Sequence, residues 1–267
     1  MLNDVGKRRG RRMVLGHRVP VSLKECRNVG CDVARWARAG YADYLSPMDF
    51  LETDLSIRAE EFVAATKGTP CRVHPSPQRW LDFTSDRSQT IHMDSLDKFR
   101  ATAHNYYTWG AHGGSTFNIY NWKADRQAYY TQVIAILSDA KLATAGPRHY
   151  MYGPMCRLYT DGPRYQKLEF PAHNIGKPQR YRFRMADGRN GESMQGTLRF
   201  RLYDATPRDE FTVALNGTQI EKGKIRVEQQ PDGKKVDKRF TWRPGLRVEI
   251  SLSDCPPFRG DNTLDVT

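Results

Sequence analysis

The stretch that decides the fold of the first half is Ala42-Asp43-Tyr44-Leu45-Ser46-Pro47-Met48, a short apolar strand followed directly by Asp49. Helical patterns flank this strand on both sides. The upstream pattern covers residues 33–39 and stops at Gly40, and the downstream pattern covers residues 57–67. Strands that alternate with helices are typical of parallel sheets with crossover connections. The stretch therefore predicts one strand of a parallel sheet.

The same alternation extends over the first 145 residues. Strands are expected at 13–20, 42–48, 70–75 and 113–120, and helices from Ser22 onward and at 33–39, 57–67, 94–110 and 126–140. Ser22 and Glu25 have the spacing of a capping box, and a polar loop is expected after residue 75. No G-x-G-x-x-G motif follows any strand, so a dinucleotide-binding fold is not supported. A barrel-type or other open α/β arrangement remains.

The second half has the alternating polar and apolar pattern of antiparallel strands. Such segments occupy residues 179–185, 197–202, 210–215 and 246–252. Asn216-Gly217 indicates a two-residue hairpin, and Gln230-Pro231-Asp232-Gly233 indicates another turn. These features predict an antiparallel β-sandwich. We therefore expect one domain over residues 1–145 and another over residues 146–267.

The charge balance is basic but not concentrated. The 267 residues include 42 Lys and Arg against 30 Asp and Glu, for a net charge of +12. The two halves share this charge equally, and the only dense cluster is Lys7-Arg8-Arg9-Gly10-Arg11-Arg12. A solvated basic surface is therefore favoured over a nucleic-acid footprint.

No apolar run is long enough for a membrane span, and the start lacks a secretory signal. A cytoplasmic location is expected unless the N-terminus is truncated.

The five cysteines do not indicate a metal or redox motif. Their positions are Cys26, Cys31, Cys71, Cys156 and Cys255, and no C-x-x-C pair occurs among them. A zinc ribbon and a thioredoxin-like motif are therefore not supported. Buried free thiols are the favoured interpretation.

Several segments carry a resemblance to known proteins. They are residues 12–20, 42–50, 106–114 with Phe117-Asn118, 213–217 and 260–266. The first half resembles the C-terminal half of a (β/α)₈ barrel, its segments matching barrel strands five, six and eight, in the broad family of glycoside-hydrolase-like proteins. The second half resembles the β-sandwiches attached to such barrels. The resemblance implies a carbohydrate-active protein.

The chain departs from that family in length. A full barrel needs about 250 residues and eight strands, whereas about four βα units precede the sandwich here. We therefore expect a half TIM-type barrel with open sheet edges and an inner face that includes Leu15, Val73 and Phe117. A second copy of the chain is the simplest cover for this face, which predicts a homodimer with an apolar interface above ~2,000 Å².

Candidate site residues are sought at the C-terminal ends of the barrel strands, where such enzymes hold their functional groups. Asp49 is the first catalytic candidate, and Glu52 or Asp54 is the second, because glycoside hydrolysis needs two carboxyl groups. The alternative is that these acids are loop charges, one of them capping the helix at 57–67. The substrate-binding candidates are His17, Arg18, His74, Trp80, Asn118, Asn121 and Trp122. Local spacing does not favour a metal site, and no cofactor is expected.

Three functions remain open from the sequence. The first is a glycoside hydrolase that acts on a polysaccharide or oligosaccharide by carboxylate acid/base catalysis. The second is a non-catalytic carbohydrate-binding protein with a truncated barrel. The third is a basic protein that binds nucleic acid or another acidic polymer, whose binding would depend steeply on salt.

Overall fold

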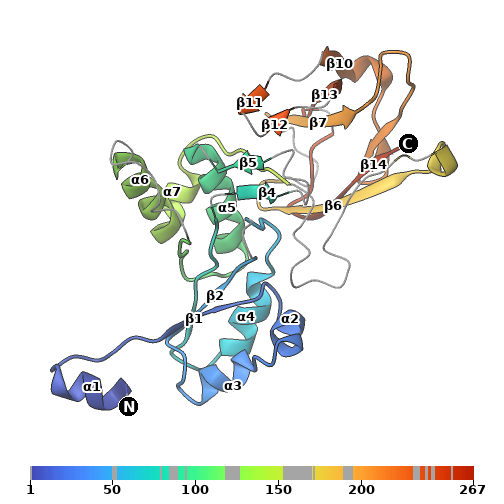
Figure 1. Ribbon diagram of the computed structural model, residues 1–267. Coiled ribbons are helices and arrows are strands. Elements are labelled where there is room, and N and C mark those ends of the chain that lie inside the picture. The colour runs from blue at the N-terminus through green and yellow to red at the C-terminus, as the bar shows by residue number, and fades with distance from the viewer. Residues whose placement is uncertain are drawn as a thin grey trace. The chain divides into compact units, whose positions relative to one another are not determined.

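The protein is described by a computed structural model with mixed helices and sheets (Figure 1). The described residues are 2–49, 53–78, 80–83, 90–93, 95–117, 127–152, 170, 172–188, 195–230, 235–237, 240–241, 244–253 and 255–267. The chain forms two compact units. The first comprises residues 1–79 and 93–149, and the second comprises residues 80–92 and 150–267.

The first unit contains a parallel sheet. Its strands are β1 (Gly16–Val19), β2 (Tyr44–Pro47) and β3 (Arg72–Val73), in the order β1-β2-β3. Gly16 lies opposite Tyr44, and Tyr44 lies opposite Arg72. A side chain at Gly16 would overlap the Tyr44 ring, which explains why this strand begins with glycine. The three strands expected between residues 13 and 75 thus form, and they are parallel as predicted.

Helices connect and cover these strands. They are α1 (Leu2–Arg8), α2 (Leu23–Asn28), α3 (Val33–Arg38), α4 (Ala59–Thr66), α5 (Leu96–Thr108), α6 (Gln127–Ser138) and α7 (Ala140–Thr144). The predicted N-cap Ser22 is confirmed, because its hydroxyl accepts a 3.2 Å hydrogen bond from the Glu25 N–H. Asp32 caps α3 in the same way. Gly40 follows α3 with a φ of 68°, a conformation that favours glycine.

The parallel sheet has two chemically different faces. Val19, Leu45 and Val73 point toward the helices and share a buried core with Cys26 of α2 and Phe62 of α4. The placement of Val73 corrects the sequence-based prediction, which assigned it to an exposed inner face. Successive strand residues point to opposite faces, so the face away from these helices has a different set. We call it the polar face; it carries Gly16, Arg18, Tyr44, Ser46, Arg72 and His74.

The fourth expected strand is not regular in its described part. The His112 N–H donates to the Val73 carbonyl (2.9 Å), and the Ser115 N–H donates to the Pro75 carbonyl (3.0 Å). Between them, the Gly114 N–H donates to Leu137 instead, which interrupts the ladder. Residues 118–120 of this prediction lie outside the described residues. The described chain therefore contains three parallel strands rather than four regular βα units, and they do not form a closed barrel.

A short hairpin occupies part of the loop that was expected after residue 75. It consists of β4 (Trp80–Phe83) and β5 (Thr90–His92), which pair antiparallel. These residues group with the second unit, so the chain passes between the units more often than a single boundary near residue 145 implies. The prediction of a loop here was wrong, because the polar composition of the segment concealed two strands of only a few residues.

The second unit is built from antiparallel strands. They are β6 (Gln179–Met185), β7 (Thr197–Tyr203), β8 (Val213–Leu215), β9 (Thr218–Gln219), β10 (Ile225–Gln230), β11 (Lys235–Asp237), β12 (Phe240–Thr241), β13 (Gly245–Ser251) and β14 (Gly260–Val266), with the short 3₁₀ helices η2 (Ala172–Asn174) and η3 (Lys222–Lys224). One sheet has the order β6-β14-β8-β9, and another has the order β10-β13-β7. Apolar side chains of both sheets form one buried cluster, with Val213 and Leu264 from the first and Val248 and Ile250 from the second.

The predicted hairpin at Asn216-Gly217 is confirmed. Asn216 has a φ of 52° and Gly217 a φ of 80°, and the turn joins β8 to β9. Two successive residues with positive φ match the right-handed twist of the strands that they connect. In the part of the chain that the structure describes, no helix is both long and apolar enough to cross a membrane.

The burial of Cys26 gives a testable pH dependence. Burial and the neighbouring Cys31 and Glu25 raise the pKa of the Cys26 thiol from 9.0 to about 12. Between pH 9 and 12 the thiol ionises in the unfolded chain but keeps its proton in the folded one. Stability is therefore lost as the pH rises through this window, by at most ~1.4 kcal/mol per pH unit.

We expect chemical unfolding midpoints to fall less between pH 8.5 and pH 10.5 in Cys26→Ala than in the unchanged protein. Comparison with the variant is needed because other groups titrate in the same range. An equal fall in both proteins would contradict the assignment.

Candidate functional site

A group of buried polar residues lies at the C-terminal edge of the parallel sheet. Asp49 follows the end of β2 and is only 3% exposed, and Ser46 of β2 and Ser76 after β3 are also buried. The side-chain amide of Gln78 donates to the main-chain carbonyl of Asp49. Gln78 and Thr53 also exchange hydrogen bonds, because the Gln78 N–H donates to Thr53 Oγ1 (2.7 Å), which donates to the Gln78 carbonyl (2.9 Å). These contacts fix the segments that follow β2 and β3 against each other.

Three polar atoms in this region retain hydrogen-bonding capacity. Within the described ranges, His74 Nε2, Ser76 Oγ and Gln78 Oε1 are buried without a hydrogen-bond partner. Buried polar atoms in folded proteins are nearly always hydrogen-bonded, so such a group is unusual in a purely structural region. A hydroxyl, an imidazole nitrogen and an amide oxygen are the kinds of atoms that bind a hydroxylated or charged ligand.

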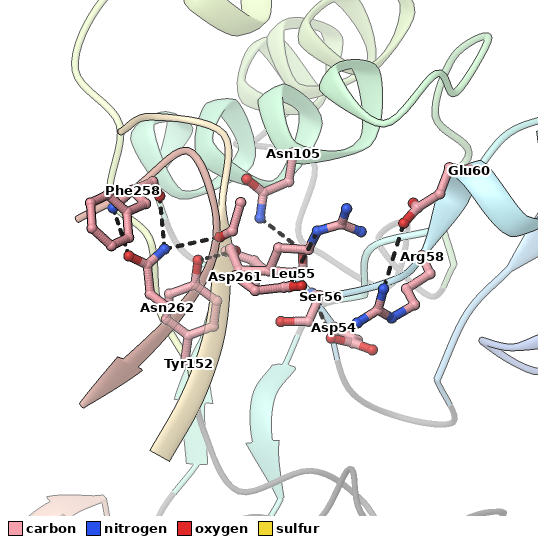
Figure 2. A network of polar contacts seen from close by, with 12 residues as sticks. Asp54, Leu55, Ser56, Arg58, Glu60, Asn105, Tyr152, Phe258, Asp261 and Asn262 are labelled. Carbon is pink, nitrogen blue, oxygen red and sulfur yellow. Dashed lines mark hydrogen bonds and ion pairs between the residues drawn. The ribbon is translucent and has the colours of Figure 1, made fainter. Parts of the chain in front are cut away.

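Asp54 is held in a turn. Its Oδ1 accepts a hydrogen bond from the Ser56 N–H (2.7 Å), and its carbonyl accepts one from the Tyr106 hydroxyl (2.8 Å). The next carbonyl, that of Leu55, accepts from the Asn105 amide (2.8 Å), as Figure 2 shows. The Asp54 carboxylate thus stabilises the turn that precedes α4. This arrangement matches the alternative that the acid is a loop charge, although the turn rather than the helix is capped.

His17 and Arg18 lie on opposite faces of the sheet. The Nε2 of His17 is 3.0 Å from the Tyr41 carbonyl, and its ring lies 5.1 Å from the ring of Trp36 in α3. The structure therefore places His17 on the helix-covered face, away from Arg18. The guanidinium carbon of Arg18 lies 3.8 Å from the centre of the Phe117 ring, which is a cation–π geometry.

The polar face brings Arg18 and His74 into one row with Ser46. Ser46 lies opposite Arg18 in the register of β1 and β2, and His74 directly follows β3 on the other side of β2. The Ser115 hydroxyl is 3.0 Å from Ser46 Oγ and 3.2 Å from the His74 carbonyl. Ser115 thereby joins the C-terminal edge of the sheet to the segment that runs beside β3.

His74 is in an electropositive and partly desolvated environment. Burial lowers its pKa below 6.5, and the nearby His112 and Arg72 lower it further. The ring stacks on Tyr44 with centroids 5.5 Å apart. His74 is therefore a neutral imidazole near pH 7, able to donate through one nitrogen and accept through the other.

The remaining sequence candidates cannot be placed in this group. Glu52, Asn118, Asn121 and Trp122 lie outside the described residues. Trp80 begins β4, which groups with the second unit rather than with the sheet. Conversely, sequence reasoning missed Ser46, Ser76, Ser115, Thr53 and Gln78. The alternation along β2 could have placed Ser46 on the face of Tyr44, but nothing local in the sequence indicates the others.

No family of known proteins matches this chain, and no curated protein matches it either. Among the described residues, no group of three or more His, Cys, Asp or Glu side chains is arranged to hold a metal ion. The chemistry of the site is therefore argued from its own residues.

Proposed function

We propose that the protein is a carbohydrate-active protein, a glycoside hydrolase that acts on a polysaccharide with Asp49 as an acid/base residue. In this proposal the first unit is a partial TIM-type barrel and the second is an attached β-sandwich. The supporting observation is the burial of Asp49 just after a parallel strand, where the Gln78 side-chain amide donates to its main-chain carbonyl. Parallel-barrel enzymes carry their catalytic groups at this end of the strands.

The second carboxyl group is the discriminating feature. Glycoside hydrolysis uses a pair of carboxyl groups on either side of the scissile bond. Asp54 is engaged by the Ser56 N–H, so we propose Glu52 as the partner of Asp49. The second candidate function is a non-catalytic carbohydrate-binding protein. The bond from the Ser56 N–H to Asp54 favours it, because a carboxylate that holds a turn is not available as the second catalytic group.

The test is a panel of soluble and insoluble polysaccharides, assayed both for release of reducing ends and for co-sedimentation of the protein. A hydrolase is expected to release reducing ends from at least one substrate. Binding without any release would identify the non-catalytic alternative. Failure of both binding and release across the panel would refute the carbohydrate proposal as a whole.

We also propose that the chain forms a homodimer in which β1, an edge strand in the described sheet, lies at the interface. The sequence predicted an apolar interface. The face of the sheet away from α2 and α4 is polar instead, so less of the proposed interface can be hydrophobic. Light scattering at low micromolar concentration is expected to give twice the chain mass of 30.7 kDa. A stable folded monomer would contradict this proposal.

A further inference from the structure

The polar face of the parallel sheet carries exposed positive charge. Arg18 and Arg72 are exposed on this face, one row apart, on the two outer strands. Asp43 precedes β2 at the N-terminal edge of the sheet, where the Arg72 N–H donates to its carbonyl, whereas Arg18 lies further toward the C-terminal edge. The Asp43 carboxylate accepts a 2.8 Å hydrogen bond from the Leu15 N–H and pairs with Arg12. The charge of Asp43 is thus already balanced.

The guanidinium of Arg18 is held by an aromatic ring. Its described contact is with the Phe117 ring, which lies under the guanidinium plane. Stacking on a ring leaves the N–H groups at the edge of the guanidinium available, and these match the two oxygens of a carboxylate. The ring also limits the conformations of Arg18, which lowers the entropy lost when a ligand binds.

Neutral hydrogen-bonding groups lie near Arg18, toward the C-terminal ends of β2 and β3. Ser46 is 2% exposed and is linked to Ser115, while the buried hydroxyl of Ser76 and Nε2 of His74 have no hydrogen-bond partner within the described chain. Serine hydroxyls and imidazole N–H groups are good donors to anionic oxygens. The Arg18 guanidinium, which shares a row with Ser46 and His74, suits an acidic group better than a neutral sugar hydroxyl.

We infer that the polar face binds the carboxylate or sulfate group of an anionic polysaccharide, with Arg18 as the specificity-determining residue. This inference rests on the proposed function and names its substrate class. The net charge of +12 supports it, because a basic protein attracts a polyanion over long range. Arg18, which is exposed, fixes the acidic group, and the buried Ser46 and the half-buried His74 lie in the same row of the sheet.

The test measures binding of the full chain to polygalacturonate, to a sulfated galactan, to a neutral galactan and to single-stranded DNA, all at 150 mM salt. Arg18→Gln is expected to weaken binding of the acidic glycans by about tenfold or more, because a charge-assisted bidentate pair is lost. Arg38→Gln is the matched control, since Arg38 is exposed in the last turn of α3. Its effect is expected to be less than about twofold.

Arg18→Lys keeps the charge but loses the planar fork, so it is expected to recover only part of the affinity. Circular dichroism of each variant confirms that it is folded. Binding of the neutral galactan alone, or equal effects of the two glutamine variants, would overturn the inference and leave the carbohydrate proposal standing. DNA binding as tight as glycan binding would also overturn it. Failure to bind any glycan would instead refute the proposed function.

Discussion

Replacement of Asn262 by alanine is expected to lower the free energy of unfolding of the second unit by about 3–5 kcal/mol. Asn262 is 2% exposed and uses both ends of its side-chain amide (Figure 2). Its Oδ1 accepts hydrogen bonds from the Phe258 N–H (2.7 Å) and from the Asn216 side chain (2.8 Å). Its Nδ2 donates to the carbonyls of Phe258 (2.8 Å) and Gly260 (2.9 Å).

The loss reaches beyond the loop that Asn262 closes. Asn216 Oδ1 accepts a 2.8 Å hydrogen bond from the Thr263 N–H, so the Asn216 side chain links the β8–β9 turn to β14. Alanine at position 262 leaves several backbone groups without partners in a buried region, and that cost exceeds the value of the bonds themselves. The turn and the neighbouring end of β14 are expected to loosen together.

Urea unfolding followed by circular dichroism measures this effect. Asn174→Ala is the control in the same unit; Asn174 lies in η2 and is partly exposed, and its replacement is expected to cost less than about 0.5 kcal/mol. Asn262→Asp places a buried carboxylate oxygen against the carbonyls of Phe258 and Gly260, so its effect is expected to be at least as large as that of Asn262→Ala. A loss below about 1 kcal/mol for Asn262→Ala would show that the network is not a main support of the unit.

The elements that could be predicted from the sequence are those whose signals are local. Asn216-Gly217 requires positive φ at two successive positions, and few residue pairs adopt that conformation readily. The strand at residues 179–185 was predicted with its observed bounds, because one of its faces is apolar and the other charged. Ser22 caps α2 through a bond to a residue three positions away. Each of these features depends on neighbours within the same short segment.

The features that were missed depend on distant parts of the chain. The segment after Ala111 has the composition of a strand, but the Gly114 N–H donates to Leu137, which belongs to a helix well along the chain. Val73 was assigned to the wrong face because the pattern of a short strand does not say which face meets the helices. Asp49 could be named from its position after a strand, whereas the bond from the Ser76 N–H to the Pro47 carbonyl depends on how β2 and β3 pair.

Replacement of Asp49 by asparagine is expected to lower kcat/KM for polysaccharide hydrolysis by about 10²–10⁴-fold. The substitution removes the group that transfers a proton while keeping the shape of the side chain. It should also leave the fold intact, because Gln78 donates to the main-chain carbonyl of Asp49, which asparagine retains. The measurement is the rate of reducing-end release from the substrate found in the polysaccharide panel, with circular dichroism to verify folding.

Asp54→Asn is the matched control for this loss of activity. Asparagine Oδ1 can still accept the hydrogen bond from the Ser56 N–H, so the turn before α4 is kept and the rate should change by less than about threefold. Glu52→Gln is expected to reduce the rate by a factor comparable to Asp49→Asn, since acid and base roles are both required. If Asp49→Asn kept most of the activity while Asp54→Asn lost it, Asp54 rather than Asp49 would have to be the acid/base residue. The turn residue would then be the catalytic group, because a carboxylate that only orients the backbone does not need its charge.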